Sequence, residues 1–386
     1  MTHLFIQPTD VLVFRDGRPF DAGSDHLATG PFPPPPTTLY GALRSALLAA
    51  HGADFRADDF GVGDRVTGVT GTRTELGSLA ITAFALARRA GNGRVERLYP
   101  APLDLLTRKT KQDEAGGDPP HVLLLPQEPP AGVRTNLPEG LRLLHRPHRT
   151  GTFYGGTGAL LTETGLSRVL AGTAPEAADL VAPEQVFRRE PRTQVSLRGA
   201  SDERFTGTAQ EGKLFTVEFV RMREHAGFAV SVEASGLLGS AGLLRLGGES
   251  RPARFEAVDL PGPDAAALRA KAAETGRVKI LLTTPAPFRD GWRPDGISDD
   301  LRGALGGVAV RLVAAAVGRP LTLGGWDLVH RRPKRARPAA PAGSVYFLEL
   351  DRPADAPALF DALDGRSLCT DDEALQGLGL ARLGIW

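Results

Sequence analysis

Cysteine is nearly absent from this chain of 386 residues, and long apolar runs are missing altogether. The one cysteine, Cys369, excludes a disulfide within the chain and a zinc site built on cysteines, so we expect a reducing, cytoplasmic setting. No run of about 18 or more apolar residues exists, and we therefore expect no membrane-spanning helix. Leu4, Phe5 and Ile6 have no basic region before them, which argues against a signal peptide.

An excess of charge of either sign is also missing. The chain has 46 Lys and Arg against 45 Asp and Glu, so any affinity for a polyanion must come from local patches of charge. An apolar content of 41% is sufficient for sizeable hydrophobic cores, and the length predicts two domains or one large domain.

A helix is predicted after the proline-rich segment near residue 35. Leucines recur at helical spacing over residues 39–47, Thr37 or Thr38 is placed to cap the start, and Gly52 is placed to end the helix. Arg44 lies at the edge of the apolar face. Its side chain either covers apolar surface or points at a ligand, and the first reading is the more common one.

Two β-hairpins are predicted from alternating apolar residues. The first surrounds Asp16 and Gly17, because such a pair between apolar runs is a strong signal of a tight turn. The second joins residues 212–224 to residues 227–234 through a turn at His225.

Further strand and helix patterns follow in the second half of the chain. Residues 278–288 and 344–353 predict strands, residues 301–318 form an apolar segment with interior glycines, and residues 357–365 predict a short helix.

The chain divides into two halves with an insertion in the first. Residues from about 107 to 147 are rich in proline, glycine and charge and predict an insertion with mobile parts. A second unit begins near residue 186. Each half combines strands with few helices, so we expect an α+β fold used twice, in domains 1–185 and 186–386.

The densest cationic segment lies within residues 321–350. It has no acid between Asp327 and Glu349, and its basic side chains are His330, Arg331, Arg332, Lys334, Arg335 and Arg337. Gly324 and Gly325 let the main chain approach a ligand with no Cβ in the way, and the prolines keep the segment out of helices and sheet ladders. The segment is either a grip for a polyanion or a solvated loop.

A second basic window without acids comprises Arg142, His145, Arg146, His148 and Arg149. Aromatic residues and glycines follow it at residues 151–158. Cations, aromatics and glycine together suit neutralisation of a nucleic-acid backbone combined with stacking of its bases.

No enzyme signature fits its sequence context. The spacing of a phosphate loop occurs at Gly207–Lys213, but Leu214 stands where magnesium coordination requires Ser or Thr, and a strand pattern follows where the motif needs a helix. The motifs G-x-S-x-G and H-E-x-x-H are missing, and adjacent acids such as Asp58 and Asp59 are poorly placed to share one metal. We therefore expect no catalytic residue, no metal and no cofactor.

Several pieces of the chain, taken in order, resemble one known family. They are FRDGRPFDAG, FPPPPTTLYGALRSALL, RTQVSL, AQEGKLFTVEF, LLRLGGESR, TTPAPFRDGW, and LGGWDL followed by RRPK and PAGSVYFLEL. The family is that of the third subunits of Cmr complexes, which belong to the RAMP superfamily of type III-B CRISPR interference. The resemblance covers nearly the whole chain, although residues 105–150 and the last fifteen contribute little to it.

This resemblance implies a fold of two ferredoxin-like (RRM-like) domains with glycine-rich loops. It also implies a non-catalytic, cytoplasmic subunit of an antiviral ribonucleoprotein that caps the 5′ tag of the guide RNA. Its expected partners are the guide RNA, the large polymerase/cyclase-like subunit and the first copy of the backbone RAMP subunit, and no membrane is expected.

The residues expected to bind RNA are arginines, one lysine, two glycines and one tryptophan from the basic windows and from the pieces that carry the resemblance. They are Arg15, Arg18, Arg44, Arg146, Arg149, Arg192, Gly324, Gly325, Trp326, Arg331, Arg332, Lys334 and Arg335. Arginine and lysine neutralise phosphates, and an aromatic ring such as that of Trp326 can stack on an unpaired base. Trp326 is equally well explained as a core or interface anchor.

Two other functional classes stay open at this point. Some RAMP proteins cleave RNA without a metal, using a histidine as general acid or base, and His26 and Tyr40 are the pair that could serve in a guide-processing endoribonuclease. Such a histidine must lie within hydrogen-bond reach of the reacting oxygen. A protein-binding scaffold without RNA contact is disfavoured by the two basic windows.

Overall fold

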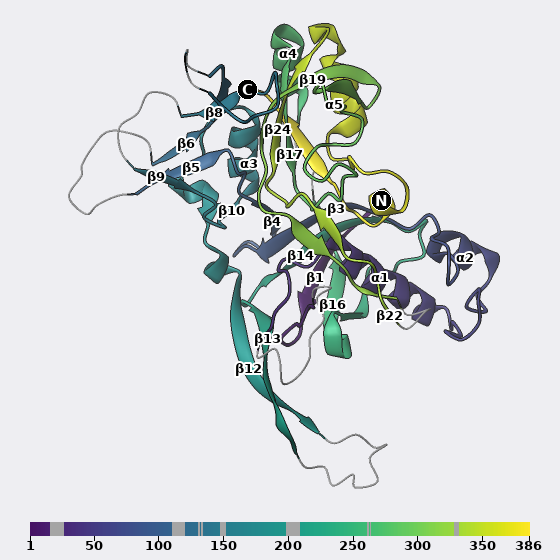
Figure 1. Ribbon diagram of the computed structural model, residues 1–386. Helices are drawn as coiled ribbons and strands as arrows, with labels where there is room; N and C mark the ends of the chain where they lie inside the picture. Colours follow the sequence, from purple (N-terminus) through teal and green to yellow (C-terminus); the bar gives the residue numbers. More distant parts are fainter. Residues whose placement is uncertain are drawn as a thin grey trace.

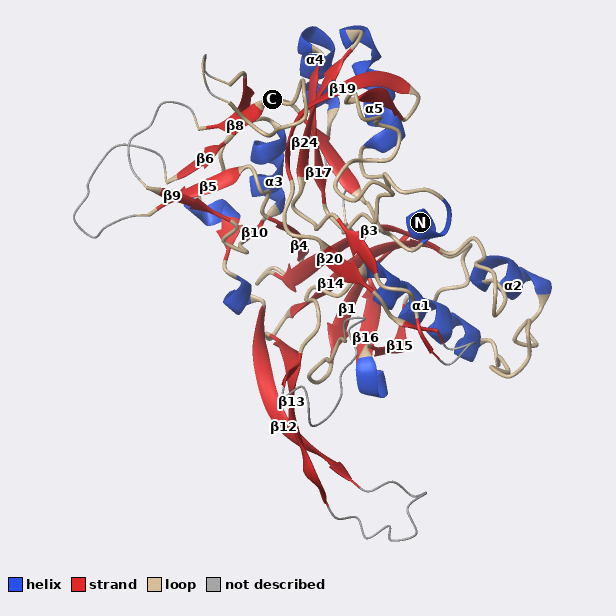
Figure 2. Ribbon diagram, viewed as in Figure 1, coloured by secondary structure: helices blue, strands red, loops and turns tan. Residues whose placement is uncertain are grey.

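The computed structural model shows two β-sheets side by side and one long hairpin that projects away from them (Figure 1). It describes residues 1–15, 27–109, 120–129, 132, 134–146, 152–197, 209–260, 262, 264–327 and 332–386. Helices cover both sheets (Figure 2). The fold combines helices with many antiparallel strands, as the α+β prediction requires in its general form. Within these residues, no helix is long and apolar enough to cross a membrane.

The first sheet has eight strands, and every neighbouring pair in it is antiparallel. In spatial order the strands are β11 (Leu180–Val181), β10 (Leu160–Leu161), β4 (Val95–Pro100), β3 (Ala80–Arg89), β14 (Ala226–Glu233), β1 (Thr2–Pro8), β16 (Arg251–Ala257) and β15 (Ala241–Leu246).

Helix α1 (Pro36–Ala50) packs against one face of this sheet, as the leucine spacing predicts. Leu39, Leu43 and Leu47 are all buried in the core that the helix shares with the sheet. The predicted threonine cap is wrong, because the helix already begins at Pro36 and no side chain caps it. Proline suits the first helical position since its fixed φ is helical and its missing N–H would have no partner there.

The predicted hairpin around His225 is also wrong. Strand β13 (Ala209–Met222) pairs with β12 (Phe187–Leu197) and β2 (Leu27–Ala28), whereas β14 pairs with β1 and β3 in the first sheet. Nearly all of β14 is buried, so it suits the middle of a large sheet better than the arm of an exposed hairpin.

The pairing of β1 with β14 and β16 joins residues on both sides of the boundary expected at 185/186. Residues 226–257 therefore share a sheet, and a core, with the N-terminal half.

The second sheet has five antiparallel strands built from the C-terminal part of the chain. In spatial order they are β18 (Arg302–Leu305), β19 (Val308–Ala316), β24 (Val345–Leu350), β17 (Arg277–Leu282) and β25 (Ala381–Gly384). Residues of α4 (Ala266–Thr275) and α5 (Ala356–Leu363) pack on one face, and α3 (Glu163–Leu170) packs on the other. The strands predicted near 278 and 344 and the short helix predicted near 357 are confirmed.

Short strands in and around the predicted insertion lie beside the second sheet. Within it are β6 (His121–Leu123), β7 (Leu125–Gln127) and β8 (Leu143–His145), whereas β5 (Leu105–Arg108) overlaps its start and β9 (Phe153–Gly155) follows its end. Strands β5, β6 and β9 form one small sheet, and β7 and β8 form another. Arg142 ties this region to the second sheet through Glu349, at 2.6 Å.

A fully buried ion pair fixes the same region to the second sheet. The Nζ atom of Lys279 on β17 lies 3.4 Å from Oδ2 of Asp104, just before β5, and the two side chains are 2% and 0% exposed. The other carboxylate oxygen of Asp104 has no hydrogen-bond partner among the described residues. Burial raises the pKa of Asp104, and the charge of Lys279 opposes that rise.

Two ribbons complete the fold. Strands β12, β13 and β2 form the projecting hairpin sheet, with tip residues 198–208 outside the described part (Figure 1). What we call the basic ribbon spans residues 321–339, with β20 (Leu321–Leu323) on β23 (Arg337–Ala339) and β21 (Trp326–Asp327) on β22 (Arg332–Pro333). The hairpin expected around Asp16 and Gly17 lies outside the described residues.

The remaining helical elements are short. They are α2 (Asp64–Thr70), α6 (Asp371–Leu375) and the single turns η1 (Ala177–Asp179), η2 (Pro183–Gln185), η3 (Gly248–Ser250) and η4 (Pro353–Asp355).

Candidate nucleic-acid interface

The base of the projecting hairpin carries a cluster of charged side chains on one of its two faces. Alternate residues of a strand share a face, and the register pairs Arg188 with Arg221 and Glu190 with Phe219. Arg192 continues this face two residues further along β12. The opposite face carries a separate pair, Arg189 with Glu218.

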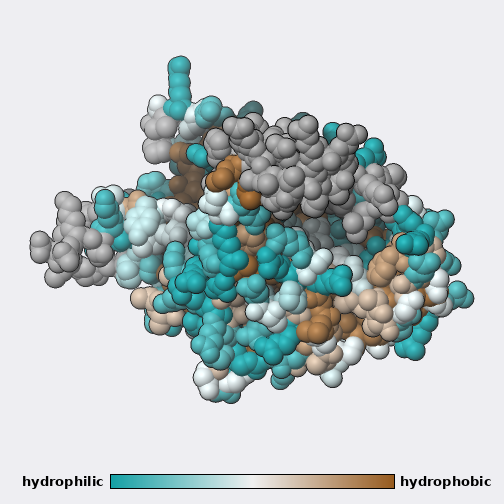
Figure 3. All heavy atoms as spheres, turned by 90° about the horizontal axis from the view of Figure 1, so that it is seen from below, coloured by the Kyte–Doolittle hydropathy of each residue, from teal (hydrophilic) through white to brown (hydrophobic). Residues whose placement is uncertain are grey.

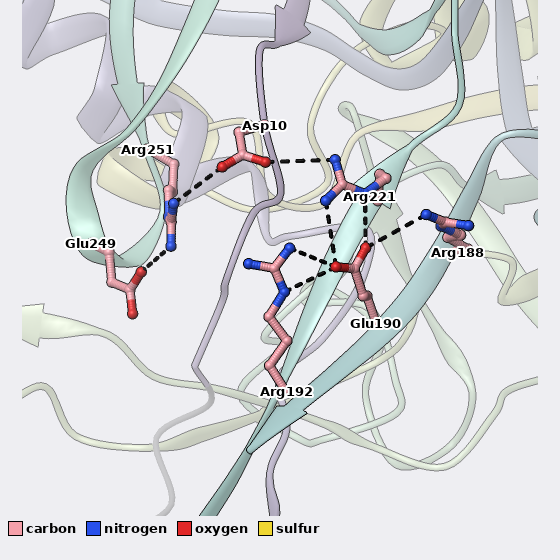
Figure 4. A network of polar contacts seen from close by, with 7 residues as sticks. All are labelled: Asp10, Arg188, Glu190, Arg192, Arg221, Glu249 and Arg251. Atoms are coloured by element: carbon pink, nitrogen blue, oxygen red, sulfur yellow. Dashed lines mark hydrogen bonds and ion pairs between the residues drawn. The ribbon is translucent and has the colours of Figure 1, made fainter. Parts of the chain in front are cut away.

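Glu190 is the centre of this cluster (Figure 4). One of its carboxylate oxygens accepts hydrogen bonds from Arg192 at 2.5 and 2.9 Å, and the other accepts one from Arg221 at 2.7 Å. Arg188 lies 3.8 Å from the same carboxylate. Hydrogen bonds from Arg221 and Arg192 lower the pKa of Glu190 to about 2, so this carboxylate is ionised at neutral pH.

Asp10 extends the cluster to the end of β1 and to the loop before β16. Its carboxylate lies 3.5 Å from Arg221 and 3.2 Å from Arg251, and Arg251 also pairs with Glu249 (Figure 4). Segments that are far apart in the sequence therefore contribute to one surface. We call Arg188, Arg192, Arg221 and Arg251 the arginine cluster.

A buried aromatic ring supports two members of the arginine cluster. The guanidinium groups of Arg192 and Arg251 lie 5.1 and 5.5 Å from the ring centroid of Phe219, whose side chain is 1% exposed. Such cation–π contacts hold a planar guanidinium group over the ring even when its hydrogen-bond partner changes.

The arginine cluster is accessible to an anion from solvent. The four arginine side chains are between 26% and 54% exposed. Four guanidinium groups face three carboxylates, those of Asp10, Glu190 and Glu249, which leaves one positive charge in excess. Guanidinium groups bind phosphate through the same paired N–H groups that bind carboxylate.

A glycine loop brings the segment before Arg15 close to the arginine cluster. Gly247 has a φ of 72°, and a Cβ at this position would lie 2.6 Å from the carbonyl oxygen of Val13. The N–H of Gly248 donates to the same oxygen at 2.8 Å. This glycine is thus explained by close packing of two parts of the main chain.

The basic ribbon presents a second group of cations. Arg332, Lys334 and Arg335 are exposed, whereas Arg337 pairs with Glu373 of α6 at 2.5 Å. The N–H of Lys334 donates to the carbonyl oxygen of Gly325 at 2.9 Å. Gly325 has a φ of 144°, in the region that favours glycine.

Three other residues expected to bind RNA have known surroundings. Arg44 donates to the carbonyl oxygens of Thr70 and Thr72 and lies 5.3 Å from the ring centroid of Phe60. Arg146 lies 4.5 Å from the ring centroid of Phe153. Arg15 is exposed at the end of the first described segment. Arg44 thus holds the loop after α2 against α1, the more common role for an arginine at a helix edge.

The remaining expected residues are only partly described. Trp326 pairs with Pro333 through the main chain, and its side chain lies outside the described part. Gly324 precedes Gly325 in the short connection between β20 and β21. Arg18, Arg149 and Arg331 lie outside the described residues.

Only one of the two residues considered for RNA cleavage belongs to the described part of the chain. His26 lies outside the described residues, and Tyr40 is 3% exposed within α1. Within the part of the chain that the structure describes, the Tyr40 hydroxyl has no hydrogen-bond partner, and burial raises its pKa. Among the described residues, no three His, Cys, Asp or Glu side chains are close enough together to hold a metal ion.

Sequence reasoning found one member of the arginine cluster, Arg192, and missed Arg188, Arg221 and Arg251. The alternating charges at 188, 190 and 192 are visible in the sequence, but alternation alone is also typical of a solvated strand. Only the pairing of β12 with β13 and the approach of Asp10 bring the four arginines together.

The fold and this surface define a mixed α/β protein with a surface cluster of arginines that carboxylates partly neutralise. The model of the family described as CRISPR-associated protein (Cas_Cmr3) matches residues 4–386, and the chain belongs to that family. This confirms the resemblance to the third subunits of Cmr complexes. Among curated proteins, no sequence matches.

Solved structures of CRISPR complexes include chains similar to this one. Two are cryo-EM structures of the type III-B Cmr-beta complex bound to cognate target RNA, one with AMPPnP (14% identity) and one without (15%). Each match has a TM-score of 0.48 and covers 89% of this chain and 86% of the other. A third is the crystal structure of a Csm3–Csm4 subcomplex of type III-A, with a TM-score of 0.37, 10% identity and coverage of 91% and 94%.

Proposed function

We propose that the protein is a non-catalytic, RNA-binding subunit of a type III-B CRISPR ribonucleoprotein, and that it caps the 5′ tag of the guide RNA. The observation that carries this proposal is the arginine cluster, because four partly exposed guanidinium groups converge on one face of a projecting hairpin. Membership of the Cmr3 family supports the same reading.

The proposed RNA surface combines the arginine cluster with the exposed cations of the basic ribbon, Arg332, Lys334 and Arg335. Seen from below, much of the described surface is hydrophilic, with apolar patches between the hydrophilic areas (Figure 3). A single strand crossing both groups would have its phosphates neutralised at several points. Arg44 is not part of this surface, because its guanidinium group is occupied by Thr70 and Thr72.

We also propose the partners that the family suggests and a division of the chain into two domains. The partners are the guide RNA, the large polymerase/cyclase-like subunit and the first backbone RAMP subunit, in the cytoplasm. The two proposed domains are ferredoxin-like units. Strand pairing favours a division between β16 and β17, in place of 185/186, because β16 belongs to the first sheet and β17 to the second.

Single-stranded RNA binding by the purified chain tests the proposal. If about five phosphates are neutralised, the log–log dependence of affinity on salt should have a slope of roughly −3.5. Alanine at Arg332, Lys334 and Arg335 together should flatten this slope by up to about 2, because each lost phosphate contact removes about 0.7. Fluorescence anisotropy across a salt series measures both values. An unchanged slope would remove the basic ribbon from the RNA surface.

We expect no cleavage of repeat RNA by the purified chain, with or without Mg²⁺ or Mn²⁺. The buried Tyr40 hydroxyl cannot reach a scissile phosphate in this conformation, and general acid–base catalysis requires hydrogen-bond reach. Gel analysis of labelled repeat RNA checks this expectation. Cleavage that disappears in a His26→Ala variant would instead establish the endoribonuclease reading.

A further inference from the structure

One carboxylate, that of Glu190, occupies the point on which three members of the arginine cluster converge. It accepts hydrogen bonds from Arg192 and Arg221 and lies 3.8 Å from Arg188 (Figure 4). Its charge also offsets the repulsion between Arg188 and Arg221, which stand directly opposite each other on the two strands. Glu190 therefore fills the place that an external anion would take.

Phosphate and carboxylate compete for the same groups on a guanidinium ion. Both accept two parallel N–H hydrogen bonds from it, and both are favoured by the charge of the arginine. A phosphate that approaches Arg192 and Arg221 from solvent gains full contact only when the Glu190 carboxylate moves away. Phe219 keeps Arg192 in place during such an exchange, because the cation–π contact does not involve Glu190.

We propose that Glu190 is an internal competitor of RNA phosphate, one that weakens binding of arbitrary polyanions to the arginine cluster. This inference rests on the proposed RNA-binding function. RNA held at further points, such as the basic ribbon, displaces Glu190, whereas RNA without those contacts does so poorly. Glu190 is thus a specificity-determining residue, and its removal strengthens binding.

Asp10 also competes with RNA phosphate for arginines of the cluster, but more weakly than Glu190. It bridges Arg221 and Arg251 at 3.5 and 3.2 Å, both longer than the shortest contacts that Glu190 makes with Arg192 and Arg221, at 2.5 and 2.7 Å. Its replacement by asparagine should therefore act in the same direction with a smaller effect.

The test compares two charge-matched variants of the full chain, Glu190→Gln and Glu218→Gln. Glu218 pairs with Arg189 on the opposite face of the same hairpin. Both variants therefore lose one negative charge, but only Glu190→Gln removes a carboxylate from the arginine cluster. The probe is a labelled single-stranded RNA of mixed sequence. We expect Glu190→Gln to bind about fivefold more tightly at 0.1 M salt, with a slope steeper by about 0.7, because one more phosphate is neutralised. Glu218→Gln should stay within about twofold of the unmodified chain, since only its net charge changes.

The possible outcomes separate this inference from the proposed function. An equal gain in RNA affinity in both variants would show a general charge effect. Weaker RNA binding by Glu190→Gln would show that the carboxylate only positions the arginines. Either result overturns the inference, while the proposed RNA-binding function stands. If neither the unmodified chain nor Glu190→Gln binds RNA, both the inference and the proposed function are overturned. Thermal unfolding of each variant checks the fold, and Asp10→Asn carries the test if Glu190→Gln does not fold.

Discussion

Alanine at Arg192, Arg221 and Arg251 together is expected to weaken binding of single-stranded RNA about 10²-fold at 0.1 M salt. Each phosphate contact on a single strand contributes about 0.7 to the salt slope, so three lost contacts flatten the slope by about 2. The effect should be larger than at an ordinary exposed arginine, because these groups converge and two of them are held over the Phe219 ring. A salt series of dissociation constants measures it.

The matched control removes three arginines at the opposite end of the molecule. Arg269, Arg302 and Arg352 each pair with an aspartate near α4, α5 and β18, away from the hairpin (Figure 1). This variant loses the same net charge, and its slope should stay within about 0.7 of that of the unmodified chain. Equal weakening by both triple variants would show that total charge, rather than the arginine cluster, governs RNA binding.

The second large effect is expected at the buried ion pair that fixes the inserted strands to the second sheet. Asp104→Ala leaves the Lys279 ammonium group buried with no carboxylate beside it, since Lys279 is 1% exposed. Removing one partner of such a pair typically lowers the free energy of unfolding by about 3–5 kcal/mol. Chemical denaturation followed by circular dichroism measures this loss.

A double variant separates the charge effect from the loss of packing. With Asp104→Leu and Lys279→Met together, no buried charge is left, and apolar pairs of similar volume are often neutral or stabilising in place of buried ion pairs. We expect the double variant to recover most of the stability that Asp104→Ala loses. If Asp104→Ala lowers the free energy of unfolding by less than about 1 kcal/mol, water must reach Lys279, and the ion pair does not hold the two parts of the fold together.

Elements whose signals are local were predictable from the sequence. Helix α1 and strands β17 and β24 lie where their patterns place them. The leucines of α1 recur at the helical period, and β17 and β24 are short apolar runs that are buried on both faces. The helix cap was missed, since Pro36 already starts the helix before either threonine.

Strand partners were not predictable, because pairing depends on residues far apart in the chain. Strands β13 and β14 follow each other closely and look like one hairpin, yet β14 lies between β1 and β3, and β13 pairs with β12. The nearly continuous apolar run of β14 was a sequence signal for a central strand, and the structure buries both of its faces.

The same limit applies to the candidate site. The exposed cations of the basic ribbon were found from composition alone, because an acid-free run needs no knowledge of the fold. The arginine cluster was found only in part. Arg221 and Arg251 join Arg192 through the register of the hairpin and through Asp10, and neither contact is local in sequence.

Crosslinking of RNA to this subunit within the assembled complex tests whether the arginine cluster and the basic ribbon bind the 5′ tag of the guide RNA. The complex would be purified from cells that express the neighbouring subunits, irradiated, and digested, and the attached peptides and RNA would be identified by mass spectrometry and sequencing. We predict that the 5′ tag of the guide RNA is crosslinked to peptides near Arg192, Arg221 and Arg332. Crosslinks confined to the far end of the second sheet, or recovery of the subunit without guide RNA, would contradict it.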